Sequence, residues 1–188
     1  MLSLHYRNQN KIGENKMVYK NKIVISAQNE NELINFLNEI GTDNQKIDFN
    51  RIIPITANTD NEVEIMQEQW GCCSNAMEVE YDIVENYATI WFETRGGNCE
   101  EVISKLSHIG KDIIQITYLY ASDTIAERCG KIESYGNDYT ITDFGERTDS
   151  ALECWCECWE EDMDMFVWDD EYECYMLNDG EEDDEWYE

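Results

Sequence analysis

The chain has 188 residues, of which 42% are apolar, enough for one domain with a hydrophobic core. Its charge lies far outside the ordinary range, because 13 Lys and Arg stand against 42 Asp and Glu, giving a formal net charge of −29. Such a charge repels nucleic acids and anionic membranes and attracts basic protein surfaces. The composition therefore argues against direct binding to DNA, RNA or a membrane.

The acidic residues are concentrated at the C-terminal end. Residues 149–188 contain 18 Asp or Glu and no Lys or Arg. We therefore divide the chain into a loosely ordered arm at 1–19, an α+β domain at 20–148, and an acidic, aromatic-rich helix and tail at 149–188.

The N-terminal residues lack the apolar stretch of a signal peptide. No apolar run approaches the length of about 20 residues that crosses a membrane. We expect a protein of the host cell cytoplasm, and we expect its eight cysteines to be reduced thiols there.

The first predicted elements are a strand at 22–26 and a helix that begins at Asn29. Apolar residues recur at helical spacing up to Ile40, and Gly41 follows as the stop. Residues 47–56 contain Pro54, which cannot donate to a central sheet ladder, so this stretch is expected to be an extended crossing segment. Residues 59–69 fit either a short helix or a loop.

The next stretch, 76–93, predicts a hairpin at the centre of the sheet. Two strands with alternating apolar and polar residues meet at a turn at Glu85 and Asn86. A helix at 100–109, a strand at 113–120 and a closing hairpin of 126–134 with 138–143 follow. The order strand, helix, strand, strand, helix, strand predicts a ferredoxin-like split βαβ sheet with two helices, to which the closing hairpin is added.

Five blocks then suggest a family: KIVISAQNENELINFL, IDFNRIIPIT, WGCCSNAMEVEYD, ATIWFETRGGNCEEVISKLS and ITYLYASDTIAERCGKIESYG. In block order, residues 20–145 resemble the YubB-like ferredoxin-like domain family of phage and plasmid proteins. The chain departs from the family at 94–97, where members usually carry Thr-Ala-Trp followed by a proline pair. The resemblance implies the fold and an origin in a mobile element, and it transfers no catalytic residues.

The acidic segment begins with a helix signal. Ser150 followed by Glu153 is typical of a capping box. Apolar residues then recur at intervals of three and four, which predicts one amphipathic helix: Leu152, Trp155, Cys156, Trp159, Met163, Phe166 and Val167. We expect the apolar face to pack on the sheet or on a second copy, with the carboxylates in solvent.

From Asp169 to Glu188, carboxylates alternate with aromatic residues. Disordered acidic tails are usually poor in aromatics, so this composition favours docking to a partner, although a plain solubility tail is the alternative. Carboxylates on an ordered scaffold imitate the phosphates of a duplex, which carry one charge about every 1.7 Å along the axis. Aromatic rings in the same strip would occupy surfaces on which bases stack.

The sequence contains no convincing catalytic or metal-binding pattern. Cys154, Cys156 and Cys158 alternate, so on a helix neighbouring members lie on different faces, and paired zinc ligands are usually separated by two to four residues. Cys72 and Cys73 fit turn or core thiols, and His108 fits a surface or otherwise satisfied position. We expect no metal, no cofactor and no enzymatic activity.

The sequence therefore favours a non-enzymatic viral or mobile-element inhibitor of the anti-CRISPR or anti-restriction type. As an acidic nucleic-acid mimic it would block the basic nucleic-acid groove of a host defence nuclease through protein–protein contact. The expected partner-binding residues are the anchors Trp155, Trp159 and Phe166, the charged residues Asp162, Asp164, Asp169, Asp170, Glu171, Asp183, Asp184 and Glu185, and the aromatic residues Tyr172, Trp186 and Tyr187.

Two alternatives stay open. One is a structural or accessory phage or plasmid protein that forms a homodimer through the apolar helix face, with an acidic tail that only confers solubility. The other is a small-molecule or metal-binding module that uses the sheet face.

Overall fold

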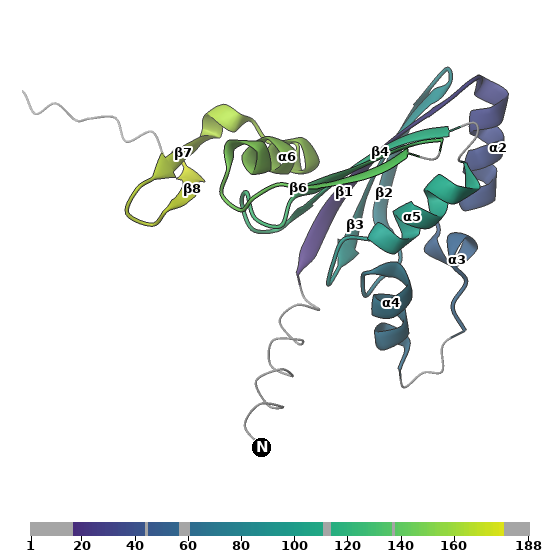
Figure 1. Ribbon diagram of the computed structural model, residues 1–188, viewed down its shortest axis with the longest axis horizontal. Coiled ribbons are helices and arrows are strands. Elements are labelled where there is room, and N and C mark those ends of the chain that lie inside the picture. Colours follow the sequence, from purple (N-terminus) through teal and green to yellow (C-terminus); the bar gives the residue numbers. More distant parts are fainter. Residues whose placement is uncertain (1–16, 44, 57–60, 111–113, 137, 179–188) are drawn as a thin grey trace, which may run out of the picture.

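The computed structural model describes residues 17–43, 45–56, 61–110, 114–136 and 138–178, and it has an α+β fold (Figure 1). Its main sheet has six strands in the order β2-β3-β1-β4-β5-β6, and each neighbouring pair is antiparallel. These strands are β1 (Val18–Ala27), β2 (Met77–Val84), β3 (Tyr87–Arg95), β4 (Ile114–Ser122), β5 (Gly130–Tyr135) and β6 (Asp138–Asp143).

Four helices cover one face of this sheet, and a fifth lies on the other face (Figure 1). The first four are α2 (Glu30–Ile40), α3 (Phe49–Ile52), α4 (Glu62–Trp70) and α5 (Glu100–Ile109), and the fifth is α6 (Asp149–Trp159). The connection from β1 to β2 carries α2, α3 and α4, and the connection from β3 to β4 carries α5. No helix among the described residues is long and apolar enough to cross a bilayer.

The predicted hairpin forms, but its place in the sheet differs from the prediction. The strands β2 and β3 meet at Glu85 and Asn86 as expected, yet β2 is an edge strand and most of its residues are exposed. The centre is formed by β1 and β4, because β1 pairs along its length with both β3 and β4. The turn supports this centre, since the Asn86 side chain donates to the Ala27 carbonyl at 2.7 Å.

The main core lies between the sheet and the first four helices. Alternate residues of β1 point into it, and α2 and α5 contribute apolar stripes at the spacing predicted from the sequence. The one buried polar side chain in the middle of β1, Asn21, donates to the Thr94 hydroxyl at 3.1 Å and accepts from the Tyr118 hydroxyl at 2.7 Å. Asn21 is therefore satisfied without water.

The prediction of an extended segment at 47–56 is wrong over its middle, where α3 forms. Asp48 starts this helix, because its carboxylate accepts from the Asn50 amide at 3.0 Å. Pro54 follows the helix and is not part of the sheet, so it interrupts no ladder. Of the two alternatives for 59–69, the helix is the one observed, as α4.

Two of the sequence blocks pack against each other around α3. Asn75 accepts from the Phe49 amide at 2.9 Å and donates to Asp48 at 2.8 Å. Trp70 is fully buried and donates from its indole nitrogen to the Ile53 carbonyl at 3.0 Å. These contacts fix the crossing segment against the start of β2.

The remaining differences concern element ends. The first strand starts at Val18, four residues before its predicted start, and β5 starts at Gly130 instead of 126. The helix predicted from the acidic segment was expected to continue to Val167, but α6 ends at Trp159. A 3-10 turn, η1 (Met163–Met165), and a two-stranded hairpin of β7 (Phe166–Asp169) and β8 (Cys174–Leu177) follow.

Candidate interaction surface of the C-terminal segment

The C-terminal segment, which we define as the described residues 149–178, starts with a helix that packs on the sheet. The Thr148 hydroxyl caps α6 by accepting from the Ala151 amide at 3.2 Å, so the N-cap lies two residues before the predicted Ser150. Leu152 and Trp155 of the helix form a second core with Leu119 and Ala121, which lie on the face of β4 opposite the main core. Of the two expected arrangements, the apolar face of the helix thus packs on the sheet of its own chain.

Two of the predicted anchors, Trp155 and Trp159, converge on one backbone atom. Both indole nitrogens donate to the Ser122 carbonyl oxygen at 3.0 Å, and the two rings stack with centroids 5.6 Å apart. Phe166, the third anchor, meets Trp155 edge-on at 5.4 Å. Trp155 and Phe166 are no more than 9% exposed, so they hold the segment in place and offer little surface to a partner.

Lysines of the sheet add an electrostatic attachment. Lys22 pairs with Glu157 of α6 at 3.1 Å, and the Lys20 ammonium lies 5.3 Å from the centre of the Trp159 ring. Lys20 also pairs with Glu93 at 3.7 Å. These lysines belong to the sheet face opposite the four helices, and their charge is balanced within the chain.

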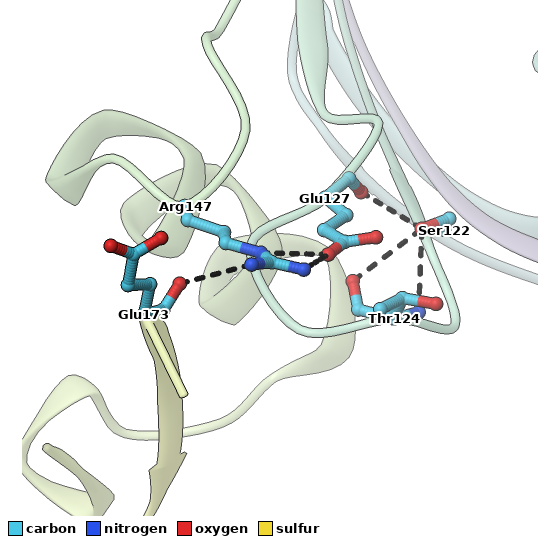
Figure 2. Close-up of polar contacts among 5 residues, drawn as sticks. All are labelled: Ser122, Thr124, Glu127, Arg147 and Glu173. Atoms are coloured by element: carbon cyan, nitrogen blue, oxygen red, sulfur yellow. Dashed lines mark hydrogen bonds and ion pairs between the residues drawn. The ribbon is translucent and has the colours of Figure 1, made fainter. Parts of the chain in front are cut away.

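Arg147, for which the sequence predicted no role, holds the hairpin of β7 and β8 in place (Figure 2). Figure 2 shows Arg147 between Glu127 and Glu173: its guanidinium donates to the Glu127 carboxylate at 3.0 Å and to the Glu173 carbonyl at 3.1 Å. Ser122 braces the same loop by donating to the Glu127 carbonyl at 2.8 Å. Only its position could have drawn attention to Arg147, since it is the last basic residue before the acidic segment.

Two of the predicted charged residues accept hydrogen bonds from nearby backbone amides. Asp162 accepts from the Asp164 amide at 3.1 Å and so starts η1. Asp169 accepts from the amides of Glu171 and Tyr172 at 2.8 and 3.0 Å, which closes the turn between β7 and β8. These bonds fix where the carboxylates lie.

The outer surface of the segment carries most of its charge in solvent. Asp162, Asp164, Asp170, Glu171 and the aromatic Tyr172 are exposed. Asp170 accepts from the Trp168 indole at 3.0 Å. The other predicted contact residues, Asp183, Asp184, Glu185, Trp186 and Tyr187, lie outside the described residues.

A hydrogen bond from Tyr175 connects the hairpin of β7 and β8 to the start of α6. The Tyr175 hydroxyl donates to the Asp149 carboxylate. This hydrogen bond to an anion raises the pKa of Tyr175 to about 12. The phenol therefore stays protonated throughout the physiological pH range and keeps its bond to Asp149.

The cysteines under α6 are buried thiols. Cys154 contacts Cys129 and Cys158, and these contacts, together with burial, raise the pKa of both neighbours. None of the eight cysteines, all of which lie among the described residues, forms a disulfide. No group of three or more His, Cys, Asp or Glu side chains with metal-binding geometry occurs among the described residues.

Cys72 and His108, which the sequence analysis weighed for catalysis, are each held in an ordinary structural position. Cys72 is buried, and desolvation raises its pKa to about 12. His108 is exposed on α5, where its Nδ1 lies 2.6 Å from the Ser104 carbonyl. Because a protonated, buried thiol is a poor nucleophile, Cys72 offers no activated group of the kind that covalent catalysis needs.

A polar cavity of about 570 Å³ was not foreseen from the sequence. Its lining includes Tyr120, whose hydroxyl donates to Asp143 at 2.9 Å, together with Arg128, Asn98 and Glu100. Among its described lining residues there is no His, Cys or Ser, so it offers none of the serine or cysteine nucleophiles that a histidine base activates.

Comparison of the sequence with family models and with curated proteins, and of the structure with solved structures, gave no match.

Proposed function

We propose that the protein is a non-enzymatic inhibitor encoded by a phage or another mobile element. Its C-terminal segment would occupy the basic nucleic-acid groove of a host defence nuclease, such as a CRISPR effector or a restriction enzyme, and exclude the nucleic acid. The observation that carries this proposal is the charge of an ordered surface: residues 149–178 contain 11 Asp or Glu and no Lys or Arg.

Order is what makes this charge useful for mimicry. The segment is held by Trp155, Trp159 and Phe166 on one side and by Arg147 on the other. A partner that binds a surface already in place loses less conformational freedom than one that must order a flexible tail. The exposed carboxylates would then meet the Lys and Arg side chains that normally bind phosphates.

The proposed origin rests on the fold as well as on the sequence blocks. We take the domain as ferredoxin-like and related to the YubB-like family. The strand order β2-β3-β1-β4, with both helical connections on one face, supports this assignment. The hairpin β5–β6 then extends the sheet and, with α6, distinguishes this chain from the simple four-stranded arrangement.

The apolar surface that the self-association alternative requires is already buried within the chain. It requires the apolar face of α6 to meet a second copy, but Leu152 and Trp155 on that face are buried against β4 of the same chain. Inhibition by the acidic surface needs no such rearrangement.

The test is inhibition of DNA cleavage by purified nucleases. We would add the protein to a panel of Cas9, Cas12 and restriction enzymes and measure both cleavage and DNA binding over a salt series. Because a charge-driven contact weakens as salt screens it, inhibition should fall as the salt concentration rises.

A matched pair of triple variants locates the surface. Glu161→Gln, Asp164→Asn and Glu171→Gln remove three exposed charges from the segment, whereas Glu62→Gln, Glu64→Gln and Glu68→Gln remove three from α4. The first triple should weaken inhibition about tenfold or more, and the second should leave it unchanged. Equal effects of the two triples, or no inhibition of any nuclease tested, would count against the proposal.

A further inference from the structure

The outer part of the C-terminal segment is apolar as well as acidic. Of the fifteen large apolar side chains that are exposed among the described residues, seven lie between residues 163 and 177. Exposed apolar side chains that gather in one place mark interaction sites more often than scattered ones do. Charge alone therefore does not describe this surface.

The strand register shows which of these side chains share a face. Val167 pairs with Met176, and Phe166 pairs with Leu177. Side chains alternate along a strand, and Phe166 points at Trp155, so Val167 and Met176 lie on the face that turns away from α6. Met165, the last residue of η1, lies next to this hairpin, because its carbonyl accepts from the Asn178 amide after β8 at 2.7 Å.

On this outer face Val167 and Met176 are exposed by 44% and 43%, and Met165, which precedes β7, is exposed by 46%. An isolated two-stranded hairpin is only marginally stable in water. Here the hairpin is fixed from behind by Phe166 and from the side by Arg147, so its outer face is held ready without a partner.

Carboxylates flank the three apolar side chains along the chain. Asp164 precedes them, Asp169 ends β7, and Asp170 and Glu171 lie in the turn between the strands. No Lys or Arg occurs between residues 149 and 178 to balance them. A partner that covers the apolar centre must therefore bring cations for the rim.

We infer that the outer face of β7–β8 is a protein-binding surface whose partner presents apolar side chains ringed by Lys and Arg. This inference rests on the proposed function and deepens it, because it places an apolar contact at the centre of the acidic surface. Methionine side chains suit this role, since they adapt to irregular surfaces. A nucleic-acid mimic that worked by charge alone would need no such centre.

The probes for the test are two synthetic helical peptides with the same number of lysines. In one peptide leucines form a stripe along the helix, and in the other serines replace the leucines. Affinities are measured by isothermal titration calorimetry with the full chain. The wild type should bind the leucine peptide about tenfold more tightly than the serine peptide, because only the leucines bury apolar surface.

Two variants show whether the hairpin provides this preference. Val167→Thr with Met176→Gln should bring the affinity ratio close to one, with Tm and circular dichroism confirming that the protein stays folded. Ile141→Thr on β6, which alters a side chain that is 46% exposed, should leave the ratio unchanged.

The outcomes separate this inference from the proposed function. Equal binding of both peptides by the wild type, or a leucine preference that survives in the double variant, overturns the apolar centre and leaves charge-driven inhibition standing. If neither peptide binds, the acidic surface does not attract cations, and the proposed function is overturned together with the inference.

Discussion

Trp155 and Trp159, one helical turn apart on α6, donate to the same carbonyl oxygen, that of Ser122, each at 3.0 Å. Their rings also stack on each other, with an angle of 16° between the planes. The two indoles therefore act as one attachment of α6 to the end of β4, and substitutions at the two positions should not be additive.

We predict that Trp155→Phe lowers the free energy of unfolding by about 1–3 kcal/mol, because it removes buried ring surface and one hydrogen bond. Trp159→Phe should have a smaller effect, since Trp159 is only partly buried. The double variant should lose more than the sum, because neither indole then reaches Ser122. Urea unfolding of the four proteins measures this, and additive losses would contradict the shared attachment.

Arg147→Ala should loosen the hairpin without unfolding the domain. The guanidinium joins the loop at Glu127 to the backbone of Glu173. Neither partner belongs to the main core, so the substitution should leave that core intact. Hydrogen exchange of the amides in β7 and β8 should become faster, while exchange in β1 and β4 stays slow. Lys105→Ala removes the same charge from an exposed position on α5 and should leave the hairpin amides unchanged.

The bond from Tyr175 to Asp149 predicts a pH dependence at the alkaline end. The folded-state pKa of Tyr175 is raised to about 12, above the ordinary value of 10.0. A group whose pKa is raised on folding contributes stability that is fully present below the unfolded pKa and is lost as pH rises through the folded pKa. The wild type should therefore be more stable than Tyr175→Phe below pH 10, and the difference should vanish towards pH 12.

Thermal unfolding of the wild type and Tyr175→Phe at several pH values would measure this difference. Subtracting the two curves removes the titration of the other tyrosines. A difference that persists unchanged above pH 12 would show that the phenol acts only through packing.

Asn75 should be a sensitive position in the domain itself. Its side chain satisfies the Phe49 amide and the Asp48 carboxylate at once. Asn75→Ala leaves the amide without its partner, which we expect to cost about 1–3 kcal/mol of folding free energy. Asn50→Ala, at an exposed site on α3, is the matched control and should change stability much less.

The elements whose signals are local could be predicted from the sequence. In α2 and α5 the apolar stripe and the following glycine agree, and both helices form where expected. The turn at Glu85 and Asn86 was found in the same way. The edge position of the hairpin of β2 and β3 could not be predicted in this way, because strand order depends on contacts between segments far apart in the chain.

The errors in the acidic segment have a different cause. Met163, Phe166 and Val167 continue the helical spacing by coincidence, while Glu160 takes a left-handed conformation with φ of 59° and ends the helix. The C-cap residue is a glutamate, so the glycine that usually signals a helix end is missing from the sequence here. The attachment through Ser122 and Arg147 also escaped prediction, since nothing in the sequence tells which carbonyl or carboxylate a side chain will reach.

The position of α6 has a practical consequence for anyone who shortens the chain. The helix buries Leu119 and Ala121 on the face of β4 that points away from the main core. A protein cut at residue 148 would expose this stripe to water, and such a fragment would tend to stick to unrelated proteins. Point substitutions in the full-length chain are therefore the sounder negative control for the acidic segment.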